Sequence, residues 1–275
     1  MGRIDMNART YGPVTRIILL AWLPIVLIVL WFVVSAQSTS VFWPPLSTIL
    51  AKFGDWAASG TLWSSLAYSF GNYFMALILA TVVGIGIGTA IGLMPRAGQV
   101  LSPYLDFFRT LPIVVFVPIV ILTLGVGRGP KVFLIFLACV WPILLNAIEG
   151  VRSIQPSVFE TARSYRIPLA LRIRRVVLPG AAPQIAIGLR LAISIGIVML
   201  VVSEMYGSTE GVGHFILQSG QRFQLAQAWA GTLLIGVIGW LFTALYMFGE
   251  HRVLVWTRQD AETRRSGRVS KGDKS

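Results

Sequence analysis

Residues Glu160 to Pro179 read ETARSYRIPLALRIRRVVLP and form a basic, amphipathic stretch between two long apolar segments. Pro168 disfavours helical geometry at the residue before it, so the chain is expected to turn near Arg166. The stretch predicts one short helix from Ser157 to about Tyr165 and a second from Leu169 to Val176. A structured, arginine-rich hairpin between two apolar segments is typical of a site that holds a partner protein.

The composition around this hairpin is that of an integral membrane protein. The chain has 275 residues, of which 55% are hydrophobic and only 12% are charged, and its mean hydropathy is +0.75. A soluble domain of this length needs more charge to cover its surface. The apolar residues also form long runs, as in lipid-spanning helices. We therefore predict one all-α membrane domain, residues 17–256, with six spans at about 17–34, 66–93, 101–124, 132–148, 181–203 and 229–248.

The third predicted span, residues 101–124, is the weakest of the six. Pro112 and Pro118 lie inside it, and Asp106 and Arg109 charge its first half. Prolines are tolerated in a membrane where neighbouring helices satisfy the freed carbonyl groups. We expect a kinked helix that contacts protein rather than lipid.

The basic residues indicate the orientation of the chain. With both termini in the cytoplasm, the inner segments carry 18 Lys and Arg residues and the outer loops carry 4. This asymmetry agrees with the positive-inside rule and places the hairpin, residues 151–180, in the cytoplasm. Residues 1–16 then form a basic cytoplasmic arm, and residues 257–275 a disordered cytoplasmic tail. The net charge of +12 reflects topology and attraction to anionic lipid, and no pattern for nucleic-acid binding accompanies it.

The first segment has two interpretations, a cleavable signal peptide or an uncleaved anchor. Its 18 apolar residues exceed the 7–15 of a cleavable core, which favours the anchor.

Three glycines of the second predicted span, Gly84, Gly88 and Gly92, recur every four residues and leave one helix face bare. Such a strip lets another helix approach closely in a membrane. The partner helix could belong to the same chain, which is the simpler interpretation, or to a second copy.

Enzymatic chemistry has no support in the sequence. There are no paired acids inside a predicted span, no Ser/His arrangement and no metal-ligand spacing, and His214 and His251 fall on opposite sides of the membrane. Cys139 is the only cysteine, which excludes an internal disulfide and predicts a small core residue. The phosphate-binding pattern GxxxxGK[ST] is also missing, so the chain has no nucleotide site of its own.

The hairpin resembles the EAA loop of permease subunits of bacterial binding-protein-dependent ABC importers. In that pattern EAA is followed by three residues, Gly, nine residues, Ile, one residue and Leu-Pro. Here Glu160-Thr161-Ala162, Arg166, Val176 and Leu178-Pro179 keep the spacing. Arg166 in place of Gly is the main departure, and it implies either a different turn or a non-glycine residue at the helix end.

Two further stretches extend this resemblance to most of the chain, from about Leu62 to Phe248. Arg109-Thr110-Leu111-Pro112 is similar to the third span of the same family. Val202-Ser203-Glu204-Met205, followed by Gly211-Val212-Gly213, resembles the nitrate, sulfonate and taurine branch.

The resemblance implies the fold of a type I ABC importer permease and a set of partners. These are two ATP-hydrolysing subunits, an extracytoplasmic substrate-binding protein and a second permease copy, identical or related. It implies that ATP is used by the partner, that the chain holds no cofactor, and that the solute is a small anion such as a sulfonate, taurine or nitrate. The residues that it implies for contact with the ATPase are Glu160, Thr161, Ala162, Tyr165, Arg166 and Pro168. For Glu160, capping of its own helix is the simpler role, and capping together with docking is the preferred one.

A few polar residues and prolines are candidates for the pathway or its gate: Arg190, Asn146, Pro112 and Pro118. An unpaired Arg190 inside a span would cost about 2.5–3.5 kcal/mol on insertion scales, so either a pairing partner or a role at the gate is expected. Asn72 and Asn146 are expected to hydrogen-bond between helices. Glu204, at the outer end of the fifth span, is expected to be solvated.

The alternative function is a secondary transporter or channel without an ATPase partner. Such proteins place ionisable residues near the membrane midplane for ion coupling, and only Arg190 is a candidate for that position. The sequence therefore favours the ATP-driven importer.

Overall fold

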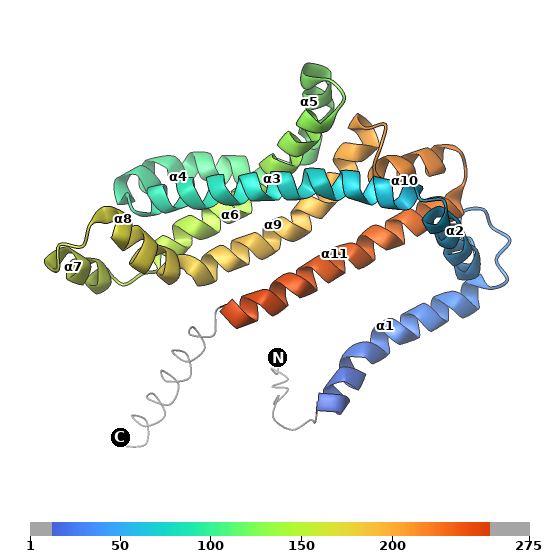
Figure 1. Cartoon of the computed structure of the whole chain (residues 1–275), viewed down its shortest axis with the longest axis horizontal. Helices are drawn as coiled ribbons and strands as arrows, with labels where there is room; N and C mark the ends of the chain where they lie inside the picture. Colours follow the sequence, from blue (N-terminus) through green and yellow to red (C-terminus); the bar gives the residue numbers. More distant parts are fainter. Residues whose placement is uncertain (1–12, 254–275) are drawn as a thin grey trace.

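The computed structural model describes residues 13–253 (Figure 1). Every element of regular secondary structure in this part of the chain is a helix. The predicted tail, residues 257–275, and most of the predicted arm, residues 1–16, lie outside the described residues. The helices are α1 (Pro13–Ser35), α2 (Leu46–Ala58), α3 (Thr61–Gly92), α4 (Pro95–Thr110), the 3-10 turn η1 (Ile113–Phe116), α5 (Val117–Leu124), α6 (Arg128–Arg152), α7 (Pro156–Ser164), α8 (Leu169–Arg172), the π-helical turn η2 (Ile173–Val177), α9 (Leu178–Gly207), α10 (Val212–Gln221) and α11 (Leu225–Val253). The prediction of an all-α fold is confirmed.

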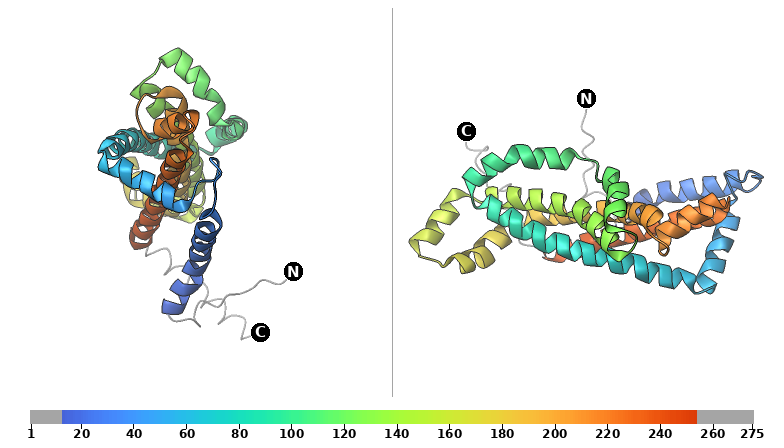
Figure 2. Two further views of the ribbon diagram at one scale, coloured as in Figure 1. Left: turned by 90° about the vertical axis from the view of Figure 1, so that its right-hand side faces the viewer. Right: turned by 90° about the horizontal axis from the view of Figure 1, so that it is seen from above.

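Three long helices, α3, α6 and α9, form the core of the molecule, with α6 packed against both of the others. They run along the long axis of the molecule in Figures 1 and 2. Buried side chains from all three helices meet in one cluster that includes Tyr73, Leu134, Ile143 and Leu200. Cys139 is buried in the same cluster, which confirms its prediction as a core residue.

The bare face of α3 lies directly against α6. A β-carbon at Gly88 would lie 2.6 Å from the carbonyl oxygen of Leu144, and one at Gly92 would lie 2.7 Å from Cβ of Val151. A β-carbon at Gly84 would similarly press on Ile143. The strip is therefore filled by a helix of the same chain, and any side chain there would force the two backbones apart.

The third predicted span is broken into two helical pieces. Arg96–Thr110 and Ile113–Leu124 meet at an angle of 75°. Pro112 stands at the break, where the backbone is extended, while Pro118 lies in the first turn of α5, where its missing N–H group is not needed. In Figure 1, α4 follows the core helices and α5 projects away from them.

Helices α1, α2 and α11 lie at the periphery and are joined near one end of the molecule by three tryptophans. The ring centroids of Trp31, Trp43 and Trp229 are 5.7–5.8 Å apart. Trp229 also donates its indole N–H to the carbonyl of Phe42. Aromatic side chains of this kind are enriched at membrane interfaces. The cluster attaches the first two helices to the last one.

Four helical segments within residues 13–253 are long and apolar enough to cross a membrane: Thr61–Gly92, Arg128–Arg152, Leu169–Gly207 and Leu225–Val253. The bent pair would make a fifth. The region of the first predicted span is helical as part of α1, and its shorter apolar part within the described residues is Trp22–Ser35. The count of six spans stays a prediction.

Candidate functional site

The predicted hairpin forms one tip of the molecule, beyond the ends of α3 and α6 (Figure 1). Its first helix, α7, begins at Pro156, and its N-cap residue Gln155 makes no side-chain capping hydrogen bond. The capping role expected for Glu160 is therefore wrong. Proline is favoured at a first helical position, because its fixed φ suits the helix and its missing N–H is not required there. The Glu160 side chain is exposed and takes no part in the start of α7.

Arg166 holds the turn of the hairpin in a left-handed conformation, with φ at +50°. The N–H of Ile167 donates to the carbonyl of Ala162 at 3.0 Å, and the N–H of Arg166 donates to that of Arg163 at 2.9 Å. These two bonds define a Schellman motif, the helix ending that glycine usually makes. Arg166 in place of the glycine of the family pattern therefore does not change the turn. It is a non-glycine residue at a helix end of the usual kind.

The apolar side chains of α7 are divided between two faces. Ala162 is buried, with 3% of its surface exposed, and Phe159 packs against Val151 and Val177 of the neighbouring helices. Tyr165 is 79% exposed. Of the residues that the resemblance implies for contact with the ATPase, Tyr165 is therefore accessible, whereas Ala162 is buried within the chain and fixes the hairpin to the core.

The second helix of the hairpin is continuous with α9. Leu169–Arg172 passes through the π-helical turn Ile173–Val177 into Leu178–Gly207, so that Leu169–Gly207 forms one rod of 39 residues. The second predicted helix, Leu169 to Val176, and the fifth predicted span are therefore not separate. Pro179 lies in the first turn of α9, and the wider turn before it accommodates the missing N–H. Pro168 is the N-cap residue of the rod. The hairpin tip and α9 are therefore parts of one continuous helical segment.

A buried polar cluster lies at the opposite end of the three core helices. The Glu204 carboxylate is 0% exposed, and its Oε2 accepts hydrogen bonds from the Ser69 hydroxyl and the Gly213 N–H, both at 2.9 Å. Ser69 in turn accepts from the N–H of Val212 at 3.0 Å. The expectation that Glu204 is solvated is wrong. Its side chain reaches the first turn of α10, where free N–H groups favour a negative charge.

Both glycines of Gly211-Val212-Gly213 are required by this contact. Gly211 has a φ of +105°, and a β-carbon there would lie 2.5 Å from the Glu204 carboxylate. A β-carbon at Gly213 would lie 2.5 Å from the carbonyl oxygen of Val201. The glutamate and the glycine pair, seven to nine residues apart, therefore form one structural unit.

A lysine completes the cluster and was not singled out from the sequence. Lys131, at 1% exposure, donates at 2.7 Å to the Tyr68 hydroxyl and at 2.7 Å to the Ser208 hydroxyl. Nearby, Nε of Arg128 donates to Asn72 at 3.1 Å, which confirms the predicted interhelical bond of Asn72. No local pattern marks Lys131 as buried. Only the packing of α6 between α3 and α9 does so.

The candidate pathway residues are dispersed. Arg190 of α9 pairs with Glu250 of α11 at 2.5 Å, which matches the paired interpretation, although Glu250 itself was not predicted as the partner. Asn146 donates to the carbonyl of Pro142 in its own helix, so its predicted interhelical bond is wrong. Pro112 lies at the break before η1 and Pro118 in the first turn of α5.

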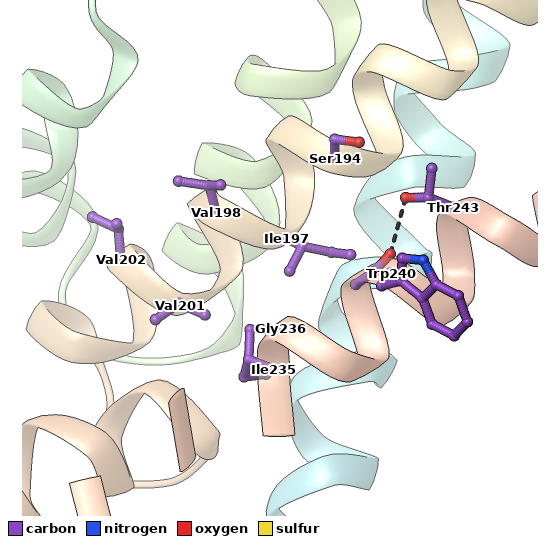
Figure 3. Close-up of a pocket in the computed structure, with 10 residues that line it drawn as sticks. Ser194, Ile197, Val198, Val201, Val202, Ile235, Gly236, Trp240 and Thr243 are labelled. Atoms are coloured by element: carbon purple, nitrogen blue, oxygen red, sulfur yellow. Dashed lines mark hydrogen bonds between the residues drawn. The ribbon is translucent and has the colours of Figure 1, made fainter. Parts of the chain in front are cut away.

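The groove between α9 and α11 is almost wholly apolar (Figure 3). It has a volume of about 570 Å³ and is lined by side chains such as Ile197, Val201 and Trp240. Its hydroxyl groups, Ser194 and Thr243, bond to backbone carbonyls of their own helices. The groove has no charged group to hold an ionic ligand. No group of three or more His, Cys, Asp or Glu residues between 13 and 253 is placed to bind a metal ion.

Comparisons with known proteins agree on one family. Residues 80–253 match the model of the binding-protein-dependent transport system inner membrane component. The chain is 31% identical to the taurine transport system permease protein TauC of Escherichia coli K12, over 85% of this chain and 87% of that protein. It is also 31% identical to the putative aliphatic sulfonates transport permease protein SsuC of Bacillus subtilis 168, over 85% and 86%. The bicarbonate transport system permease protein CmpB of Synechococcus elongatus is 31% identical over 66% of each chain.

A solved structure has the same fold. A chain of the MetNI methionine ABC transporter, in an inward-facing conformation, matches with a TM-score of 0.58 and 16% identity, over 72% of this chain and 96% of that one.

Proposed function

The chain belongs to the family of binding-protein-dependent transport system inner membrane components, and from this we propose that its hairpin is the contact through which an ATP-hydrolysing subunit drives it. The chain is a membrane-embedded permease of an ATP-driven importer and not an enzyme. A secondary transporter or channel without an ATPase partner is not the function of this family.

One observation carries the coupling role: the exposed tip of the hairpin is joined without a break to α9. Glu160, Thr161 and Tyr165 are exposed on α7 and at its end, while Phe159 and Ala162 hold α7 to the core. A partner that binds the exposed side chains and moves them would rotate or shift α9 as a rigid body. ATP is bound and hydrolysed by that partner, and this chain needs no cofactor of its own.

The substitution Glu160→Arg tests the contact. The variant should insert and fold normally, because the Glu160 side chain is exposed and makes no capping bond. It should lose solute uptake and retain less ATPase subunit on co-purification, because a reversed charge at an interface opposes docking. Asp55→Arg, an equal charge reversal on exposed α2 at the other end, is the matched control and should keep both. Wild-type uptake together with wild-type ATPase co-purification in the Glu160 variant would contradict the proposal.

We place the hairpin in the cytoplasm, with both chain termini on the same side, because the basic residues are concentrated there. Helix α11 runs back towards the hairpin end in Figure 1, in keeping with this arrangement. The buried polar cluster and α10 then face the outside, where an extracytoplasmic binding protein would deliver the solute.

The proposed solute is a small anion. The named relatives carry taurine, aliphatic sulfonates and bicarbonate, which share a compact anionic group. The apolar groove between α9 and α11 offers no charge for selection, so the binding protein is expected to select the solute. A ligand screen on that binding protein, with sulfonates, bicarbonate and nitrate, tests this assignment. Binding of only solutes that lack an anionic group would overturn it.

A second permease copy is proposed to cover α5 and the open face of α9. Leu122 of α5 is 86% exposed although α5 is strongly apolar, and Leu191, Ile195 and Val198 form an exposed stripe on the otherwise buried α9. A central helix that is open along one stripe is expected to face either a pathway or a second subunit. The two copies, identical or related, would enclose the pathway between these stripes.

Disulfide cross-linking tests this interface. In a Cys139→Ser background, Leu122→Cys should give a covalent dimer on mild oxidation in membranes. Val82→Cys, at an exposed position of α3 that lines neither the groove between α9 and α11 nor the stripe of α9, is the matched control and should stay monomeric. Equal cross-linking at both positions would contradict the proposed interface. A dimer that forms only when a related permease gene is co-expressed would identify a heterodimer.

A further inference from the structure

A second groove lies beneath the hairpin, between the ends of α3 and α6 and the helices α7 and α8. Its volume is about 710 Å³. Six of the side chains that line it define its chemistry: Leu93, Met94 and Phe159 are apolar, and Arg152, Arg163 and Arg172 are cationic. The pairing of a cationic pocket with apolar walls distinguishes this groove from the uncharged groove of Figure 3.

The three arginines are not neutralised within the described part of the chain. None of them forms an ion pair there, and Nε of Arg172 is buried without a hydrogen-bond acceptor. Glu160 is the one acid that lines the groove. Three guanidinium groups and one carboxylate leave an excess of positive charge, and a buried guanidinium N–H without an acceptor is unfavourable.

Arg152 reaches from the end of α6 across the first turn of α4. Position 98 in that turn is a glycine, and a β-carbon there would collide with the guanidinium of Arg152. The first turn of α4 contains no acidic residue that could pair with it. The guanidinium therefore lies beside Gly98 at the edge of the groove without an opposite charge among the described residues.

We propose that this groove binds the phosphate of an anionic phospholipid headgroup from the inner leaflet. The proposal rests on the cytoplasmic placement of the hairpin in the proposed function. Guanidinium groups bind phosphate oxygens in pairs, and basic pockets between transmembrane helices on the cytoplasmic side suit lipid headgroups.

The apolar walls favour a lipid over a free phosphate ion. Met94 and Leu169 line the groove and are largely exposed, so the glycerol backbone and the first part of an acyl chain would cover them. A lipid held there would contact α3, α6 and the hairpin together. It would steady the hairpin against the core and make coupling depend on anionic lipid.

Lipid titration of the purified full-length chain tests the site. The chain, in phosphatidylcholine nanodiscs with increasing fractions of phosphatidylglycerol, should bind phosphatidylglycerol by native mass spectrometry and melt at a higher temperature. Arg152→Gln with Arg172→Gln should weaken that binding about tenfold or more, because two charge-assisted contacts are lost. Arg174→Gln with Arg175→Gln is the matched control, because it also removes two positive charges, next to Arg172 but outside the groove lining.

The outcomes separate this inference from the coupling role. An equal loss of phosphatidylglycerol binding in both double variants would mean general surface attraction and would overturn the proposal. Equal thermal stabilisation by inorganic phosphate or glycerol 3-phosphate would identify a free-anion site and would also overturn it. Lipid binding is measured without the ATPase. If Glu160→Arg leaves transport unchanged, the lipid result can therefore still be interpreted. If the lipid does not bind, the proposed coupling role is unaffected.

Discussion

The two ends of the core helices differ in how they use charge. At the hairpin end, Glu160 and the arginines are exposed or line an open groove, and few of them have partners within the chain. At the opposite end, Glu204 and Lys131 are buried and bonded to side chains and backbone from several helices. Exposed, unpaired charge suits a surface that meets partners. A buried hydrogen-bonded network that joins several helices favours one conformation, here with Oε1 of Glu204 left without a partner among the described residues. We infer that the hairpin end is the part that moves when a partner binds, and that the end at α10 keeps its structure.

Replacing the buried carboxylate of Glu204 should give the largest loss of stability. Glu204→Ala removes the acceptor for the Ser69 hydroxyl and the Gly213 N–H and leaves both buried donors without it, which should cost about 3 kcal/mol or more of unfolding free energy. Lower yield and a lower melting temperature in detergent would report it. Glu210→Ala, an acid near the cluster but not buried, is the control. If both variants melt at the wild-type temperature, the cluster does not hold that end together.

A smaller loss is expected from a single added methyl group at the same end. Gly213→Ala would place a β-carbon 2.5 Å from the carbonyl of Val201, and overpacking of this kind costs about 1–3 kcal/mol. Gly220→Ala, in the same helix α10, meets no atom within 4 Å and should be neutral or slightly stabilising. The difference between the two melting temperatures is the measurement. No difference would mean that α10 is free to shift away from α9.

The smallest change in stability is expected at the two left-handed turns, one at the hairpin end and one after α10. Arg166 and Phe223 have φ values of +50° and +57°, and each ends a helix with the same pair of backbone bonds. Glycine avoids the steric cost of this conformation, so Arg166→Gly and Phe223→Gly should each gain about 1 kcal/mol. Slower amide hydrogen exchange at the turn measures the gain.

The outcome at Arg166 also bears on the comparison. Slower exchange with unchanged transport would show that the hairpin tolerates a stiffer turn. A variant with faster exchange at residues 165–167 would contradict the assigned backbone conformation.

Helices and their packing faces were largely predictable because they depend on local patterns. The long apolar runs, the glycine strip of α3 and the turn before Pro168 are all visible in the sequence, and each appears in the structure near its predicted place. The break at Pro112 was expected as a kink, and the structure gives its size. The continuity of α8 with α9 was missed, because a π-helical turn leaves no recognisable pattern when prolines follow it.

The partners of the polar residues could not be predicted in the same way. Arg190 and Glu250 are sixty residues apart, and Ser69 and Glu204 are separated by 135. Glu204 follows an apolar run and precedes a loop, a position that equally suits a solvated residue. Its burial depends on α10 folding back over the end of α9, which no local pattern specifies.

The sequence by itself determined a membrane-embedded, all-helical chain with a basic hairpin, because hydropathy, proline and glycine act on neighbouring residues. The tertiary structure decided which charges are buried, which side of α7 is accessible and which helices enclose a groove. Those properties depend on contacts between segments far apart in the chain, where the energy of burying a polar group is set by the partners that the fold brings to it.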